Sequence, residues 1–360
     1  MTAKLIRNAY EAVLTMTAVL LCWAATLVLE GAVGLHTDVL VLAVSLTLSL
    51  SATQRTADTR RRLISLALLP ATAGVSIFVG RLIASHYALG ATVYTVWMAL
   101  AIWIRRYGPT ATKIGTLLAL PLVALLVLPG PALPREAQRG LVTWGWSAVV
   151  GALACGFVWL VQGVGDRFGP WSAEPAPEPP RRPSRLHPRP STRMALQMAA
   201  AIAAAFVLGT VLFDHHWPWV VLTAYVAASG NRGRNDVLRK GVERLVGACL
   251  GTLLAVAVAA AGVTGHASVA LMFAVLTVAL WLRPLNYAFW AAGMTCALSL
   301  VLGYFGQDAQ SLLPTRLEGI VVGAVLSVVS AWWLLPVRRR PDGDGGKSGA
   351  RPIGIGVPGS

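Results

Sequence analysis

The chain has 360 residues, of which 56% are hydrophobic and only 12% are charged, and its formal net charge is +15. Soluble domains carry about 25% charged residues, so this composition excludes an ordinary soluble globular protein. A basic chain can bind nucleic acid, and the placement of Lys and Arg along the sequence decides whether that reading applies here.

Apolar runs follow one another along the whole chain, many of them near the ~20 residues that cross a bilayer. In chain order they cover residues 9–29, 39–52, 63–83, 88–104, 114–128, 141–161, 194–213, 217–228, 245–263, 267–282, 288–302 and 320–335. Two of them, 39–52 and 217–228, are short enough to be tilted, half-buried or re-entrant segments instead of full spans.

The basic residues support counting all twelve runs as spans. With the N-terminus inside, 26 of the 30 Lys and Arg fall on the cytoplasmic side, and the other four are Arg81, Arg135, Arg139 and Arg316. This asymmetry is the one that cytoplasmic loops show, and omitting one short run would invert every later loop. We therefore predict an all-α polytopic membrane protein with about 12 transmembrane helices and both termini in the cytoplasm. The bilayer, and not nucleic acid, is its expected partner.

Two features near the start and within the runs bear on processing and cofactors. Lys4 and Arg7 before an apolar run resemble a signal peptide, but the run is long and more spans follow, so a retained first span is expected. The four cysteines lie inside apolar runs without metal-ligand spacing. We expect neither a disulfide framework, nor a metal, nor any other cofactor.

A Pro- and Arg-rich stretch divides the chain into two halves. Residues 166–192 have the composition of an exposed linker. The predicted organisation is a first six-helix membrane unit at 1–165, this cytoplasmic linker at 166–192, a second six-helix unit at 193–337 and a disordered cytoplasmic tail at 338–360.

The two halves match in several places. Ile102-Trp103-Ile104-Arg105 returns as Leu280-Trp281-Leu282-Arg283, 178 positions later. Further matches in the same order pair Arg7 with Arg193, Arg62-Leu63 with Arg244-Leu245, and Arg139 with Arg316. Because six is even, both halves start on the same side, which predicts two parallel repeats, an arrangement known among secondary transporters.

The second half carries a family resemblance. It contains Trp217-Pro218-Trp219, then Arg239-x-x-x-Glu243-Arg244-Leu245-x-Gly247-x-x-x-Gly251, and finally Arg316-x-Glu318-Gly319-x-x-x-Gly323. This pattern resembles the fusaric-acid-resistance-like family of integral membrane transporters, related to aromatic carboxylic acid exporters. The resemblance implies a multi-pass protein of the bacterial inner (plasma) membrane that exports small organic anions. Larger members carry a cytoplasmic domain after each membrane unit, where this chain has only the linker and the tail.

Arginines at the predicted span ends are the candidate substrate contacts. Arg139 and Arg316, one per half, lie on the side where Arg is scarce and could hold an organic anion by bidentate contacts, with Glu318 restraining Arg316. Their alternative role is a surface or lipid-phosphate contact. Arg283 with Asn286 could present donors to a carboxylate, or Arg283 could serve only as a topological anchor.

Candidate coupling or gating residues lie at the other span ends. Glu243 and Arg244, with Arg239 one turn before, form a predicted gate or anion cluster at the inner mouth, the alternative being an anchor with its counterion. Glu11 within the first span is a candidate proton carrier, since intramembrane carboxylates by default suggest function. Its alternative is an ion pair with Arg7. Gln197 is its counterpart in the second half and cannot titrate.

These observations predict a secondary transporter that exports small organic anions such as aromatic carboxylic acids. The tail segment Gly345-Gly346-Lys347-Ser348 lacks the earlier glycine of a phosphate-binding loop, because Pro341 stands there, so no nucleotide-binding module is expected. We expect no enzymatic activity. The alternative is a membrane scaffold or assembly partner without transport activity, and the sequence leaves a homo-oligomer open.

Overall fold

The computed structural model describes residues 2–33, 38–54, 59–127, 141–168, 190–229, 234–263, 265–304 and 313–334. Within these ranges the chain forms twelve α-helices and two short 3-10 helices, and no strand. The all-α prediction is therefore confirmed. Each predicted apolar run overlaps one helix, including the two short runs at 39–52 and 217–228.

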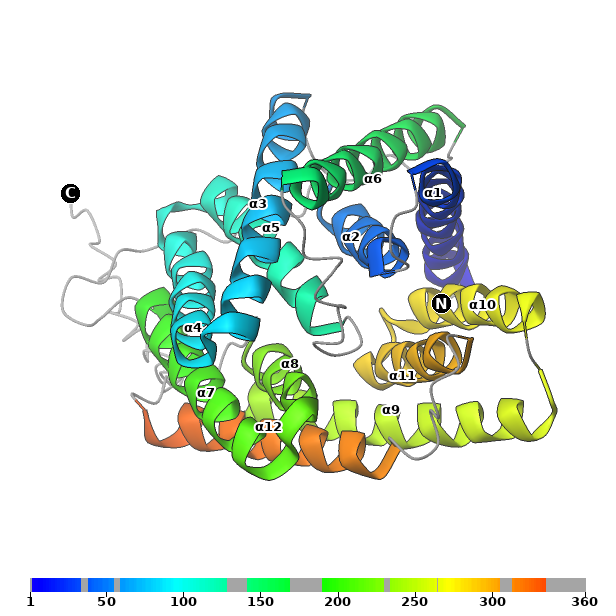
Figure 1. The fold of residues 1–360 in the computed structure, drawn as a ribbon. Coiled ribbons are helices and arrows are strands. Elements are labelled where there is room, and N and C mark those ends of the chain that lie inside the picture. Colours follow the sequence, from blue (N-terminus) through cyan, green and yellow to red (C-terminus); the bar gives the residue numbers. More distant parts are fainter. Residues whose placement is uncertain are drawn as a thin grey trace, which may run out of the picture.

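The first six helices precede the linker and the other six follow it (Figure 1). The helices before the linker are α1 (Thr2–Val33), α2 (Asp38–Gln54), α3 (Thr59–Ser85), α4 (Tyr87–Trp103), α5 (Pro109–Val127) and α6 (Leu141–Phe168). Those after it are α7 (Pro190–Phe213), α8 (Trp217–Ala228), α9 (Arg234–Ala260), α10 (His266–Leu282), α11 (Tyr287–Tyr304) and α12 (Leu313–Trp333).

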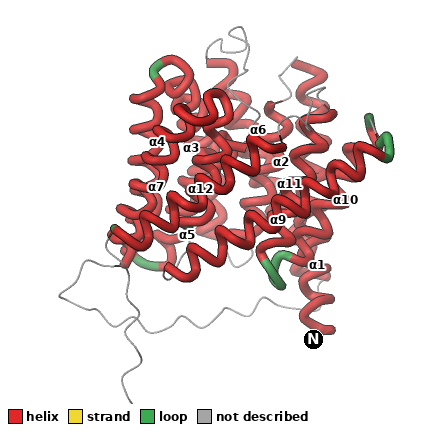
Figure 2. The backbone as a smooth tube through the Cα atoms, turned by 90° about the horizontal axis from the view of Figure 1, so that it is seen from below, coloured by secondary structure: helices red, strands yellow, loops and turns green. Residues whose placement is uncertain are grey.

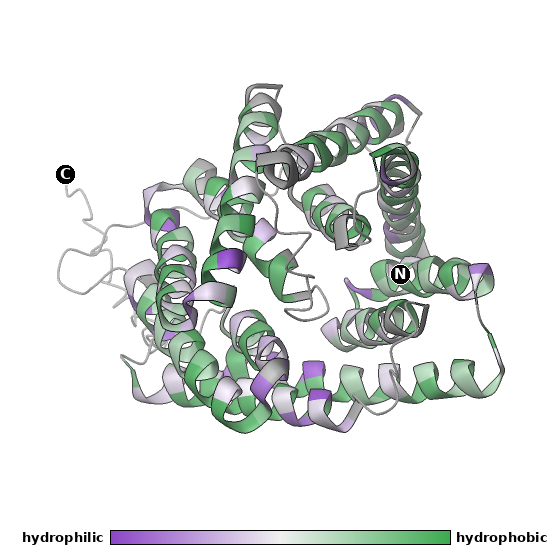
Figure 3. Ribbon diagram, viewed as in Figure 1, coloured by the Kyte–Doolittle hydropathy of each residue, from purple (hydrophilic) through white to green (hydrophobic). Residues whose placement is uncertain are grey.

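The outer surface of this bundle is apolar. Large aliphatic side chains stand far out of the protein, with exposed fractions of 74% for Val28, 74% for Val211 and 65% for Leu253. Figure 3 shows hydrophobic residues along almost every helix, with hydrophilic residues gathered where α9 and α12 meet. Exposed apolar area of this extent suits hydrocarbon and not water. The chain is a multi-pass membrane protein.

The helices differ in how clearly they cross the bilayer. By length and composition, seven are long and apolar enough to span: α1, α3, α4, α6, α7, α9 and α12. The other five, α2, α5, α8, α10 and α11, are apolar over 10–17 residues. The prediction that all twelve cross the membrane, with both termini inside, thus stays a prediction.

Several hydroxyl side chains inside the helices bond to their own backbone. The Thr26 hydroxyl donates to the Cys22 carbonyl at 2.7 Å, and the Thr47 hydroxyl donates to the Ala43 carbonyl at 2.7 Å. Both bonds run back one turn within the same helix. A bilayer core offers no water, so a hydroxyl there must find its acceptor inside the protein.

The two halves contact each other along two seams. At one, α4 packs on α7, and the Tyr87 hydroxyl donates to the Phe206 carbonyl at 2.9 Å. At the other, α1 packs on α10, and the Trp281 indole N–H donates to the Leu5 carbonyl at 3.0 Å. Figure 1 shows the resulting outline, with α4 and α7 on one side and α1 and α10 on the other; Figure 2 shows the same bundle turned by 90°.

Several predicted boundaries were wrong, always because a helix continues into polar sequence. The helix α9 begins at Arg234, well before the apolar run at 245–263, and α12 begins at Leu313, before the run at 320–335. The predicted linker 166–192 has helical ends, since α6 continues to Phe168 and α7 begins at Pro190. The rest of the linker and the tail 338–360 lie outside the described residues. The helices α9 and α12 therefore include five charged residues predicted at span mouths, namely Arg239, Glu243, Arg244, Arg316 and Glu318.

Candidate functional site

Four helices of the second half meet at close range through glycines. On α12, a Cβ added to Gly323 would lie 2.8 Å from the Thr223 Cβ of α8. On α9, a Cβ added to Gly251 would lie 2.9 Å from the Thr295 Cβ of α11. Glycine has no side chain, and this allows the helix backbones to approach this closely. The close approach brings the polar side chains of α8, α9, α11 and α12 together.

Arg316 lies between these helices and is only 7% exposed. Its Nη1 is 3.4 Å from both the Thr295 carbonyl and the Ser299 hydroxyl of α11, and its guanidinium stands 4.5 Å from the centre of the Trp219 ring of α8. Its Nε is buried without a hydrogen-bond partner. The first turn of α12 is helical and places Arg316 inside the bundle, so its predicted role as an anion contact stays a prediction.

Arg244 of α9 is half-buried and belongs to the same polar cluster. Its Nε donates to the Thr223 hydroxyl of α8 at 3.1 Å, and its Nη1 donates to the Tyr287 hydroxyl of α11 at 3.3 Å. Both arginines thus contact residues of α8 and α11, Arg244 through Thr223 and Tyr287 and Arg316 through Trp219, Thr295 and Ser299. Within the described ranges no carboxylate forms an ion pair with either arginine.

This arrangement favours binding of an anion. A buried charge left without a counterion is strongly destabilising, and two like charges at short range add repulsion. Hydroxyl groups of Thr223, Tyr287 and Ser299 stabilise the arginines only as dipoles. An anionic group between Arg244 and Arg316 would neutralise their positive charge and accept hydrogen bonds from both guanidinium groups.

The region that holds this cluster has relatives. Residues 199–330 match the family model described as fusaric acid resistance protein-like, and that span includes Trp219, Thr223, Arg244 and Arg316. Residues 199–330 are therefore similar to the fusaric acid resistance protein-like family. The fusaric acid resistance-like unit thus covers nearly all of α7 to α12, and the family indicates membrane transport or efflux in broad terms. Comparisons with curated proteins and with solved structures find no match.

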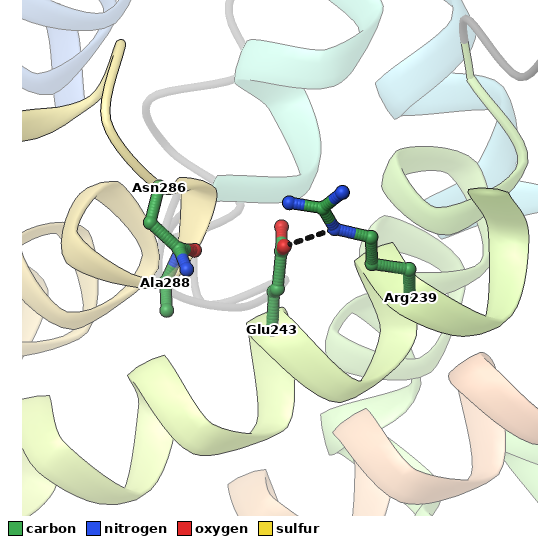
Figure 4. A network of polar contacts seen from close by, with 4 residues as sticks. All are labelled: Arg239, Glu243, Asn286 and Ala288. Carbon is green, nitrogen blue, oxygen red and sulfur yellow. Dashed lines mark hydrogen bonds and ion pairs between the residues drawn. The ribbon is translucent and has the colours of Figure 1, made fainter.

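Glu243 stands apart from the arginine pair of the fusaric acid resistance-like unit. Its carboxylate accepts a 2.7 Å bond from the Nε of Arg239, one turn earlier on α9 (Figure 4). The Glu243 side chain is 15% exposed, whereas that of Arg239 is 74% exposed. Glu243 thus has Arg239 as its counterion, the pairing that the anchor alternative contains. Glu243 therefore leaves the charge of its neighbour Arg244 uncompensated.

Two other predicted substrate contacts have local partners. Asn286 accepts the Ala288 backbone N–H at 2.8 Å, which caps the start of α11. Arg283 is exposed and stands 5.2 Å from the ring centre of Trp290. The structure thus gives both residues local contacts.

Two further predictions concern Arg316. Glu318 is exposed and forms no ion pair with Arg316 in the described part of the chain, so the expected restraint was wrong. Residues two apart point to different faces of a helix, which explains the separation. The proposed partner Arg139 lies outside the described residues.

The predicted coupling residues lie elsewhere in the fold. Glu11 is half-buried on α1, where its backbone carbonyl accepts the Thr15 hydroxyl at 2.9 Å. Gln197 of α7 donates its side-chain amide to the Leu334 carbonyl at 2.6 Å, directly after the end of α12. Gln197 therefore holds the end of a helix.

Sequence reasoning missed most of the polar partners in the cluster. Thr223, Thr295 and Ser299 were read as parts of apolar runs, and Tyr287 lies directly before the run at 288–302. Each of the four supplies an oxygen to Arg244 or Arg316. Hydroxyl residues are common in membrane helices because they can bond to their own backbone. Nothing in their local sequence separates these four from the others.

Proposed function

We propose that the protein is a secondary transporter that exports small organic anions, such as aromatic carboxylic acids, across the bacterial inner membrane. The observation that carries this proposal is the pair Arg244 and Arg316. Two arginines from different helices converge among hydroxyls in the membrane part, and no described carboxylate pairs with them. A carboxylate substrate supplies the missing counterion.

The direction and the substrate class rest on the family. The fusaric acid resistance-like match supports efflux in general, and the resemblance to aromatic carboxylic acid exporters motivates the choice of aromatic acids. The Trp219 ring beside Arg316 adds a flat apolar surface at the same place. An aromatic ring could stack there while its carboxylate meets the arginines.

The proposal includes two parallel six-helix repeats with twelve crossings and cytoplasmic termini. Equivalent helices pack on equivalent partners: α1 contacts α2 and α6, and α7 contacts α8 and α12. A Cβ on Gly115 would meet Ala101, and a Cβ on Gly293 would meet Ala279. Both residues of the second contact lie 178 positions after those of the first, the shift already seen between Trp103 and Trp281. These correspondences support the repeat.

Transport in cells tests the proposal. Cells that lack or overproduce the protein would be loaded with radiolabelled benzoate and other carboxylates, with and without an uncoupler. We expect lower accumulation on overproduction, abolished by the uncoupler and by Arg244→Ala or Arg316→Ala. Arg239→Ala is the matched control, because Arg239 is the arginine of α9 that is exposed and already paired.

The alternative function, a membrane scaffold, gives a different result. A scaffold would tolerate loss of both cluster arginines and would leave the accumulation of every acid unchanged. If the protein is present in the membrane and no carboxylate responds, the transport proposal is wrong and the scaffold is favoured.

A further inference from the structure

One sequence pattern occurs twice within the fusaric acid resistance-like unit. On α9 the chain reads Arg244-Leu245-x-Gly247-x-x-x-Gly251, and on α12 it reads Arg316-Leu317-x-Gly319-x-x-x-Gly323. The second copy follows the first by 72 positions. This shift differs from the one that relates the two six-helix halves, so it concerns a smaller repeat inside the second half.

The packing of the two glycine pairs follows the same shift. A Cβ on Gly323 would meet Val220 and Thr223 of α8. A Cβ on Gly251 would meet Ala292 and Thr295 of α11, each 72 positions after its counterpart. Likewise Gly319 faces Trp219 and Val220, and Gly247 faces Ala291 and Ala292. The contact between α9 and α11 thus repeats the contact between α12 and α8. The contact residues of α12 and α11 lie 72 positions after those of α9 and α8.

The two copies run in opposite directions. In each helix pair, the glycine with the higher residue number contacts partner residues with higher numbers. Therefore α8 is parallel to α12, and α9 is parallel to α11. In Figure 1, α9 and α12 lie along the same edge of the molecule, and the colours show that they run oppositely. The pair α8–α9 therefore matches the pair α11–α12 only after it is turned over. An inverted repeat of this kind places equivalent residues toward opposite faces of the membrane.

Arg244 and Arg316 are also related by the shift of 72 positions, but their hydrogen bonds differ. Arg244 donates its Nε to the Thr223 hydroxyl. The equivalent bond would join the Arg316 Nε to the Thr295 hydroxyl, since Thr295 is the counterpart of Thr223. Instead Arg316 reaches only the Thr295 carbonyl, through Nη1 at 3.4 Å, and its Nε is buried without a partner. In this structure Arg244 is bonded to the hydroxyl of its threonine, whereas Arg316 is not bonded to the hydroxyl of its own.

We infer that α7–α9 and α10–α12 form an inverted repeat in which Arg244 and Arg316 are equivalent contacts for one anionic group, each serving one side of the membrane. This inference rests on the proposed function. In the opposite state the Arg316 Nε bonds to the Thr295 hydroxyl, and Arg244 leaves Thr223. The Thr295 hydroxyl then positions Arg316, although the two are not bonded in this structure.

Matched threonine variants test the hydroxyls. If only the hydrogen bonds of this structure mattered, Thr223→Val would impair benzoate transport and Thr295→Val would not. The inference predicts that both do, each by about tenfold, because each removes one hydrogen bond to a charged donor. Thr295→Ser, which keeps the hydroxyl, should transport normally. Normal transport by Thr295→Val would overturn the inference.

Side-specific labelling tests the inversion itself and needs no transport. Ala227 of α8 and Ser299 of α11 are equivalent and both buried, with exposed fractions of 1% and 5%. In a variant without native cysteines, Ala227→Cys and Ser299→Cys should react with a membrane-impermeant thiol reagent from opposite sides. Adding Thr223→Val or Thr295→Val should shift the balance of this labelling in opposite directions. Reaction of both cysteines from the same side would overturn the inverted repeat.

The two proposals fail in different ways. If Arg244→Ala and Arg316→Ala abolish benzoate transport but both cysteines react from one side, organic-anion transport stands and the inverted exchange is wrong. If the cysteines react from opposite sides but no carboxylate is transported, the inverted repeat stands and the substrate assignment is wrong.

Discussion

Arg244 on α9 donates its Nε to the Thr223 hydroxyl on α8 at 3.1 Å, and its Nη1 reaches the Tyr287 hydroxyl on α11. One side chain therefore links three helices. A guanidinium can do this because its donors form a rigid planar fork, whereas an ammonium group acts as a point charge.

Arg244→Lys should therefore weaken carboxylate binding although the charge is kept. Lysine can replace one of the two interhelical bonds but not both, and hydrogen bonds of charged donors contribute roughly 1.5–3 kcal/mol each. We expect at least a tenfold rise in the dissociation constant for benzoate, measured on purified protein by isothermal titration calorimetry. Arg239→Lys is the control and should bind benzoate normally. Equal affinity of both variants would show that the fork of Arg244 is not used.

Trp219→Leu should weaken the same binding through Arg316. The Trp219 ring stands 4.5 Å from this guanidinium, and a cation–π contact contributes about 0.5–2 kcal/mol, more when desolvated. Trp219→Phe should retain part of the effect. The control is Trp290→Leu, because Trp290 lies under the exposed Arg283, outside the cluster. A loss of affinity in the control as large as in Trp219→Leu would contradict a specific role for Trp219.

Gly323→Ala should destabilise the packing of α12 on α8. The added methyl would lie 2.8 Å from the Thr223 Cβ and 3.1 Å from the Ala224 backbone nitrogen, so the helices must separate. Overpacking of this kind destabilises by about 1–3 kcal/mol. Thermal unfolding in detergent should show a lower midpoint. Gly156→Ala on α6 is the control, since nothing lies within 4 Å of its added Cβ. It should be neutral or stabilising, because alanine favours helices.

Gln197→Leu should loosen the end of α12 and leave the pH dependence of transport unchanged. Gln197 donates to the Leu334 carbonyl at 2.6 Å, and losing such a bond costs about 1 kcal/mol. Hydrogen–deuterium exchange of the last turn of α12 should be about fivefold faster. Leu196→Ala, at an adjacent exposed position, should leave this exchange unaltered. A changed pH profile in Gln197→Leu would instead place Gln197 in the coupling pathway, as the sequence first suggested.

The helices were predictable because each one is determined by the composition of its own segment. A run of apolar residues in a bilayer must form a helix, since each backbone group has to bond within its own segment. Each run from 9–29 to 320–335 accordingly corresponds to one helix from α1 to α12. The starts of α9 and α12 were not predictable in the same way, because the residues that follow Arg234 and Leu313 include polar ones, which hydropathy does not assign to a span.

The candidate site was only partly predictable. Arg316 stood out because Arg is scarce on the predicted outer side, and Arg244 stood out because it follows Glu243 at the predicted inner mouth. That both arginines contact α8 and α11, and that Glu243 turns instead to Arg239, depends on which helix face each residue occupies and on what packs there. Glu318 shows the same point, because it is two positions from Arg316 yet exposed on another face.

By itself the sequence determined that this is a helical membrane protein with a fusaric acid resistance-like second half, because hydropathy and motif spacing act along the chain. The tertiary structure alone decided which polar groups converge. Thr223 and Thr295 bracket the arginine pair only because Gly251 and Gly323 bring helices into backbone contact, and that contact joins residues about 40 to 100 positions apart. Such long-range packing depends on the three-dimensional fit of helix surfaces, which no single stretch of sequence contains.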